Sequence, residues 1–160
     1  MPGLTDVMPA MESFQAALHA REIEVVPGQV APNLGFYTDT IPGVQRFVYV
    51  FHNGSTVKAY ACFVPYERHE GLPVFAVGYA VPEAYRGQGL AKAIFAAGIT
   101  ELQHLFAGNP PFFVEAIIDP GNLASQRVAA AVLGGAHRSI TDQASGLPAL
   151  QYLRKFETGR

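Results

Sequence analysis

One segment of this 160-residue chain, residues 74–106, constrains the fold more than any other. It begins with the almost wholly apolar run from Val74 to Val81, which is typical of a strand covered on both faces. A short polar turn with Gly87 and Gly89 follows, and apolar residues then recur at helical spacing from Leu90 to about Phe106. The segment therefore predicts an α/β unit in which the N-terminus of a helix lies beside the end of a central strand.

The rest of the chain supplies further elements of both kinds. Apolar spacing predicts helices at residues 9–20 and from Leu123 to about Val132. β-rich runs predict strands at residues 22–26, 44–51, 56–64, 112–118, 137–140 and 151–156. The Pro-, Gly- and Asn-rich residues 27–42 and the polar residues 66–71 are expected to form loops. We expect one α/β (α+β) domain over residues 1–160, with helices against a mixed sheet, because the chain is too short to divide comfortably into two cores.

Composition argues against several classes of partner. Charged residues make up 15% of the chain and the formal net charge is -2, so no broad basic surface exists for nucleic acid. No stretch approaches the ~20 apolar residues that span a bilayer, and the N-terminus carries no leader pattern. We therefore expect a cytoplasmic protein that binds neither membrane nor nucleic acid. The single cysteine, Cys62, cannot form an internal disulfide and is expected to be a buried, inert thiol.

The polar turn before the long helix has the properties of an anion site. Unpaired amides and the positive end of the helix dipole favour a phosphate there, and Gly87 and Gly89 let it approach the backbone. Arg86 adds a charged donor, although the glycines could equally serve only the turn, with Arg86 in solvent. The sequence contains no Walker loop. The dinucleotide-binding fingerprint fails as well, because Lys92 stands where its third glycine is required.

This turn, Arg86-Gly87-Gln88-Gly89-Leu90-Ala91, resembles motif A of the GNAT N-acetyltransferases, although the family's proline usually stands one residue later than Pro82. Downstream, residues 122–128 before Leu133-Gly134-Gly135-Ala136 resemble motif B of the same family. The two motifs together cover about residues 74–136. The resemblance implies a mostly antiparallel central sheet flanked by helices. It also implies an enzyme that transfers an acetyl group from acetyl-coenzyme A (acetyl-CoA) to a primary amine.

The resemblance also implies which residues hold the coenzyme. Backbone groups at the end of the central strand would pair with the pantetheine arm, and amides of the turn would hold the pyrophosphate. The implied coenzyme-binding residues are Ala80, Val81, Arg86, Gly87, Gln88, Gly89, Leu90, Ala91, Lys92 and Asn122. For Arg86 the backbone position matters more than the charge, and Lys92 has the alternative of a solvated helix residue. Asn122 has the alternative of an ordinary helix N-cap.

The acid and base of such a reaction are less clearly marked. The tyrosine that many GNAT enzymes carry seven residues after the motif B asparagine is absent, because that position is Ala129. Ser125 is the replacement that the resemblance suggests, with water as the alternative. Glu115 interrupts an apolar strand and is the candidate base, with a structural hydrogen-bonding role as the alternative. The five histidines and the cysteine show no zinc-like spacing, so we expect no metal.

Two further functions stay open at this point. A GNAT-like domain without the tyrosine could be an inactive acyl-CoA-binding module that serves as a sensor or scaffold. A nucleotide-dependent enzyme is disfavoured because both phosphate fingerprints fail. The sequence does not distinguish a small-molecule amine from a peptide N-terminus as acceptor, nor a monomer from a homodimer.

Overall fold

A computed structural model describes residues 6–159, so the predicted domain 1–160 begins and ends outside the described part. Its strands form one sheet in the order β1-β2-β3-β4-β5-β6-β8-β7. The strands are β1 (Val26–Pro27), β2 (Leu34–Ile41), β3 (Val44–Asn53), β4 (Thr56–His69), β5 (Leu72–Ala80), β6 (Phe112–Ile118), β7 (His137–Thr141) and β8 (Pro148–Phe156). Among the strand pairs of residues 6–159, only β5 with β6 is parallel. The predicted mixed, mostly antiparallel sheet is therefore confirmed.

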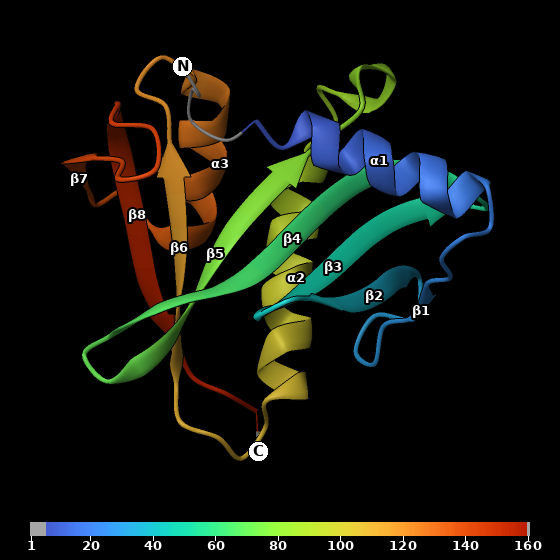
Figure 1. The fold of residues 1–160 in the computed structure, drawn as a ribbon, viewed down its shortest axis with the longest axis horizontal. Coiled ribbons are helices and arrows are strands. Elements are labelled where there is room, and N and C mark those ends of the chain that lie inside the picture. Colours follow the sequence, from blue (N-terminus) through green and yellow to red (C-terminus); the bar gives the residue numbers. More distant parts are fainter. Residues whose placement is uncertain (1–5, 160) are drawn as a thin grey trace.

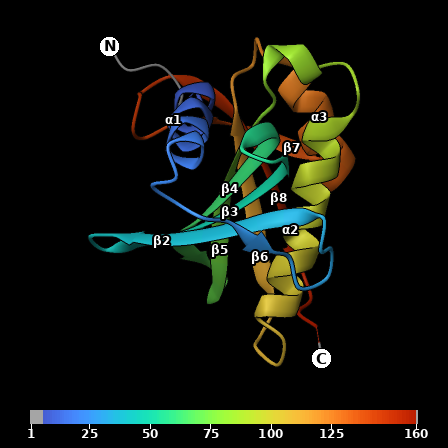
Figure 2. The same cartoon turned by 90° about the vertical axis from the view of Figure 1, so that its right-hand side faces the viewer.

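Helices cover the two faces of the sheet unequally. Helices α2 (Leu90–Leu105) and α3 (Leu123–Leu133) pack on one face, and α1 (Met8–His19) lies on the other (Figures 1 and 2). A single 3-10 turn, η1 (Glu83–Tyr85), connects β5 to α2. Because α1 packs against β3, β4 and the end of β5, no helix of residues 6–159 covers the same face of β6 and β8.

The larger core lies between the sheet and helices α2 and α3. Phe63, Phe95, Leu102 and Val114 are completely buried there. Gly98 of α2 allows the close approach of helix and sheet, since a Cβ at this position would stand 2.6 Å from the Phe63 ring. A smaller core beneath α1 is built from the predicted stripe Met11, Phe14 and Leu18, together with apolar residues of β3 and β4. Burial of these two apolar surfaces is the main stabilising term of the fold.

The parallel strands β5 and β6 pair over only three residues each. Val74, Phe75 and Ala76 lie opposite Phe113, Val114 and Glu115. Beyond Ala76 the two strands diverge toward their carboxyl ends, as Figure 1 shows. The divergence opens the sheet between the ends of two parallel strands, which is where α/β sheets commonly bind ligands.

Three sequence predictions were wrong in detail. Residues 34–41, expected in a loop, form strand β2, because they pair along their whole length with β3. Residues 66–69, also expected in a loop, extend β4, and the hairpin turn lies at Glu70-Gly71, both with positive φ. The strand expected at residues 22–26 is reduced to the two residues of β1. The expected helices, the hairpin of β3 and β4, and strands β6, β7 and β8 are confirmed within a few residues.

Candidate active site

The N-terminus of α2 is open. Gly89 is its N-cap in the left-handed conformation, with φ of 75°, and no side chain caps the helix. A Cβ at Gly87 or Gly89 would meet no atom within 4 Å. Among residues 6–159, the amides of Leu90, Ala91 and Lys92 have no hydrogen-bond acceptor. The first bond of the helix runs from the Ala93 amide to the Gly89 carbonyl oxygen. These free donors, at the positive end of a 16-residue helix, are suited to an anion.

A cavity of about 510 Å³ lies against this helix end, and we call it the helix-end cavity. It brings together nearly all the predicted coenzyme residues. Those lining it are Ala80, Val81, Arg86, Gly87, Gly89, Leu90, Ala91, Lys92 and Asn122. Gln88 does not line it and is exposed. Residues from the end of β5, the turn, α2 and the start of α3 thus surround one space.

The side chain of Arg86 turns away from the amides. Its Nε donates to the Val81 carbonyl oxygen across 2.9 Å, and its Nη2 lies 3.5 Å from the Met8 sulfur. The guanidinium therefore fixes the polar turn against the end of β5. The Val81 carbonyl oxygen thus already accepts one hydrogen bond from the protein.

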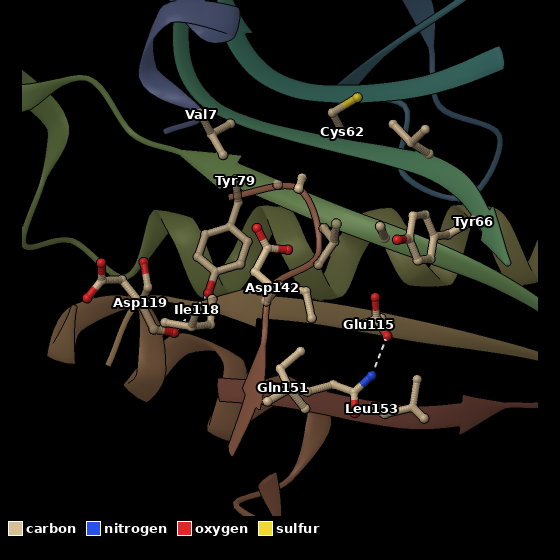
Figure 3. A pocket seen from close by; sticks show the side chains of 18 of the residues that line it. Val7, Cys62, Tyr66, Tyr79, Glu115, Ile118, Asp119, Asp142, Gln151 and Leu153 are labelled. Carbon is tan, nitrogen blue, oxygen red and sulfur yellow. Dashed lines mark hydrogen bonds between the residues drawn. The ribbon is translucent and has the colours of Figure 1, made fainter. Parts of the chain in front are cut away.

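A larger cavity of about 1490 Å³ occupies the sheet face that α1 leaves uncovered, and we call it the sheet-face cavity. Its floor comes from β4, β5, β6 and β8. Its walls are the start of α1, the hairpin of β4 and β5, and the loop between β7 and β8 (Figure 3). Tyr79, Asn122 and Ser125 line both cavities. The two cavities therefore meet where β5 and β6 diverge.

Glu115 points into the sheet-face cavity from β6. It is only 8% exposed, and its Oε2 accepts a hydrogen bond of 2.6 Å from Nε2 of Gln151 (Figure 3). Oε1 of Gln151 in turn accepts one of 2.7 Å from Nε of Arg138. The arginine thus orients the amide so that it presents a donor to the carboxylate. A carboxylate held in this way at a cavity floor is positioned to accept a proton.

The first turn of α3 carries the other predicted residues. Asn122 is the N-cap, and its Oδ1 accepts from the amide of Ser125 across 3.0 Å. The ordinary capping role is therefore present, while Asn122 also lines both cavities. Ser125 contributes its carbonyl oxygen, which accepts a 2.8 Å hydrogen bond from the hydroxyl of Tyr79. Burial raises the pKa of Tyr79 to about 12.

Sequence reasoning did not identify Gln151, Arg138 or Tyr79. Gln151 and Arg138 lie on β8 and β7 and reach Glu115 only through strand pairing. Tyr79 sits in an apolar run and looks like a core residue. The sequence gives one signal: Gln151 is a polar residue in a predicted strand, and it directly follows the apolar Leu150.

Cys62 is half-buried and lines the sheet-face cavity, so the expectation of a fully buried thiol is wrong. Burial raises the pKa of this thiol, which keeps it protonated and weakly reactive. In the part of the chain that the structure describes, no three His, Cys, Asp or Glu side chains gather as metal ligands. None of the helices described there is long and apolar enough to cross a membrane.

Comparison with protein families gives a match over residues 16–134 to the acetyltransferase (GNAT) family. The chain belongs to the GNAT acetyltransferase family. The matched residues include the turn before α2 and the start of α3. A comparison with curated proteins found no match.

Solved structures support the same fold. A ribosomal-protein-alanine N-acetyltransferase from Brucella melitensis matches with a TM-score of 0.50 and 16% identity, over 96% of this chain and 81% of that one. A putative acetyltransferase from Acinetobacter baylyi ADP1 matches with a TM-score of 0.51 and 19% identity, over 73% of this chain and 66% of that one. An acetyltransferase of the GNAT family from Streptococcus pneumoniae matches with a TM-score of 0.51 and 8% identity, over 69% of this chain and 66% of that one. This GNAT chain thus spans just under two thirds of the latter two proteins.

Proposed function

We propose that this GNAT protein transfers an acetyl group from acetyl-CoA to a primary amine by direct attack. One observation carries the proposal. A cavity with free helix-end amides and a cavity with a buried carboxylate meet at the opening between β5 and β6. A thioester held by the first cavity would present its carbonyl to an amine in the second. The proposal takes residues 1–160 as a single acyltransferase domain, which the one continuous sheet supports.

The helix end suits the diphosphate of coenzyme A. The amides from Gly87 to Lys92 would hold it, because free N–H groups and the helix dipole both favour negative charge. Lys92 is exposed at the cavity wall and would add a positive charge, whereas the Arg86 side chain would keep the turn in place. The backbone of Ala80 and the amide of Val81 would pair with the pantetheine arm. Asn122 would face the same arm from the start of α3.

The chemistry forms an N–C bond and breaks the C–S bond of the thioester. Glu115 would accept the proton that the amine nitrogen loses, and Gln151 and Arg138 would hold that carboxylate in a fixed orientation. Ser125 would stand beside the leaving sulfur, at the junction of the cavities. The acceptor is a small-molecule amine or a peptide N-terminus, since the sheet-face cavity of about 1490 Å³ has room for either.

A second function is favoured by one observation. The position of the family's motif B tyrosine is Ala129, which is completely buried and has no hydroxyl. A GNAT domain of this kind could bind acyl-CoA and act as a sensor or scaffold without turnover.

Thiol release from acetyl-CoA separates the two functions. The panel should contain small primary amines, amino acids and short peptides with free N-termini. Release that depends on one acceptor class supports the transferase, and binding without release from any acceptor supports the module. Thermal shift with acetyl-CoA, NADH and ATP adds a control, because a ligand of the folded state raises its stability. A shift with a nucleotide alone would contradict both functions.

A further inference from the structure

Among the tyrosines of residues 6–159, only Tyr79 borders the junction of the two cavities. It lines both the helix-end cavity and the sheet-face cavity. Its ring leaves β5 beyond the last residue that pairs with β6 and points toward Ile118 and Asp119 at the end of β6 (Figure 3). The hydroxyl reaches the first turn of α3, where it donates to the Ser125 carbonyl across 2.8 Å.

This hydroxyl lies close to where a motif B tyrosine would begin. Ser125 and Ala129 are four residues apart on α3, so their backbones are one helical turn apart on the same face. Ala129 is a small, completely buried residue. Helix α3 therefore has no tyrosine, and the facing strand β5 brings the phenol hydroxyl of Tyr79 to it. From this we infer that Tyr79 is the proton donor to the leaving sulfur of the thioester, an assignment that rests on the proposed transferase function.

The contacts of Tyr79 fix its position. Its ring packs on Phe95 with centroids 5.1 Å apart, which holds the side chain against α2 while the hydroxyl stays at the cavity junction. The carboxylates among residues 6–159 that line the two cavities are Asp6, Glu67, Glu115, Asp119 and Asp142, and Tyr152 is a neighbouring phenol. None of these groups accepts a hydrogen bond from the Tyr79 hydroxyl. The hydroxyl donates to the neutral Ser125 carbonyl, and a ligand sulfur could take the place of that acceptor.

The proton balance closes with the groups present. The amine attacks the thioester carbonyl carbon, and one proton of its nitrogen passes to the Glu115 carboxylate. The C–S bond breaks with its electron pair on sulfur, and the Tyr79 hydroxyl gives that sulfur a proton. Glu115 then returns its proton to water and Tyr79 takes one from water. The products are the N-acetyl amine and the free thiol. Burial keeps the Tyr79 hydroxyl protonated, and hence a donor, throughout the neutral range.

Tyr79→Phe tests the inference because it keeps the ring and its packing on Phe95. We expect kcat to fall by about 100-fold, within the range for loss of a general acid, and the KM for acetyl-CoA to change by less than about twofold. Tyr49→Phe is the matched control, since Tyr49 is a buried tyrosine of the same core that lines neither cavity among the described residues. It should keep kcat.

A second variant separates catalysis from a structural role in holding α3. Replacing Tyr79 with 3,5-difluorotyrosine keeps the hydroxyl and its size but makes it more acidic. The alkaline fall of the kcat profile should then move to lower pH, which a merely structural hydroxyl would not cause. Normal kcat in Tyr79→Phe, or a loss confined to Ser125→Ala, would overturn the inference while wild-type turnover keeps the proposed function. A wild-type protein without turnover would overturn both.

Discussion

Gln151 donates its side-chain amide across 2.6 Å to the buried carboxylate of Glu115, from the strand beside it in the sheet. The bond joins the two strands on the face that no helix covers. Because Arg138 holds the other end of the same amide, the donor cannot rotate away without breaking a second bond. The carboxylate is thus held in a fixed position at the floor of a large cavity.

Gln151→Leu should lower kcat about tenfold, because the Glu115 carboxylate loses the donor that orients it. The KM for acetyl-CoA should stay within about twofold, since Gln151 does not line the helix-end cavity. Steady-state kinetics measure both constants, and Gln103→Leu is the control. That variant also removes one side-chain hydrogen bond, but the bond is to the Glu157 carbonyl, away from both cavities. An unchanged kcat in Gln151→Leu would exclude the positioning role.

Glu115→Gln should lower kcat by about 10²-fold to 10⁴-fold, the usual range for a general base, with coenzyme A affinity unchanged. Steady-state kinetics and calorimetric titration with coenzyme A measure the two effects. Glu157→Gln is the control, because this exposed carboxylate lies outside both cavities. Full turnover in Glu115→Gln would return Glu115 to a structural role.

Glu101→Ala should destabilise the fold without touching the site. Glu101 is 5% exposed on α2, and its carboxylate accepts three backbone bonds of 2.7–2.9 Å from the loop before β2, at Gln29, Val30 and Ala31. The variant leaves three backbone donors without their acceptor, so we expect the free energy of unfolding to fall by about 3 kcal/mol. Chemical denaturation measures it, with the exposed Glu12→Ala as control. A loss below about 0.5 kcal/mol would contradict the anchoring role.

Alkaline pH should destabilise the protein through its buried tyrosines. Burial raises the pKa of Tyr49 and Tyr60, and that of Tyr79 to about 12, from an ordinary value of 10.0. The folded state therefore holds these protons more tightly than the unfolded state does. The stability is fully present below about pH 10 and is lost as the pH rises through 12.

Denaturant unfolding from about pH 8 to about pH 12 tests the alkaline prediction. Tyr60→Phe should reduce the loss of stability, because it removes one buried phenol from the folded state. Tyr66→Phe should not, because Tyr66 is 57% exposed. A free energy of unfolding that stays constant to about pH 12 would contradict the burial of these phenols.

The sequence predicted the elements whose order is local. The strand, turn and helix of residues 74–106 are continuous in the chain, and their hydrophobic period and glycines specify them without help from the rest of the fold. Strand β2 was missed because its apolar and polar residues alternate only weakly, and because the segments on both sides of it contain proline and glycine. It becomes a strand by pairing with β3, which is a non-local interaction.

The same distinction holds for the candidate site. The turn at Gly87 and Gly89 and the cap at Asn122 could be recognised from adjacent residues. The partner of Glu115 and the hydroxyl at Ser125 could not, because strand register and the β5 side chain bring them there from distant parts of the chain. Local motifs indicated the residues proposed to bind the coenzyme, and tertiary packing supplied the groups proposed to move protons.

The most direct measurement is calorimetric titration of coenzyme A into the wild type, Gly89→Glu and Gly43→Glu. Both glycines have positive φ, 75° and 80°, and open space at the Cβ position, so the variants share strain and added charge. Gly43 lies in the turn between β2 and β3, and only Gly89 caps α2. If the free amides hold the diphosphate, Gly89→Glu abolishes binding while Gly43→Glu retains wild-type affinity. Equal affinity in all three proteins would contradict the account.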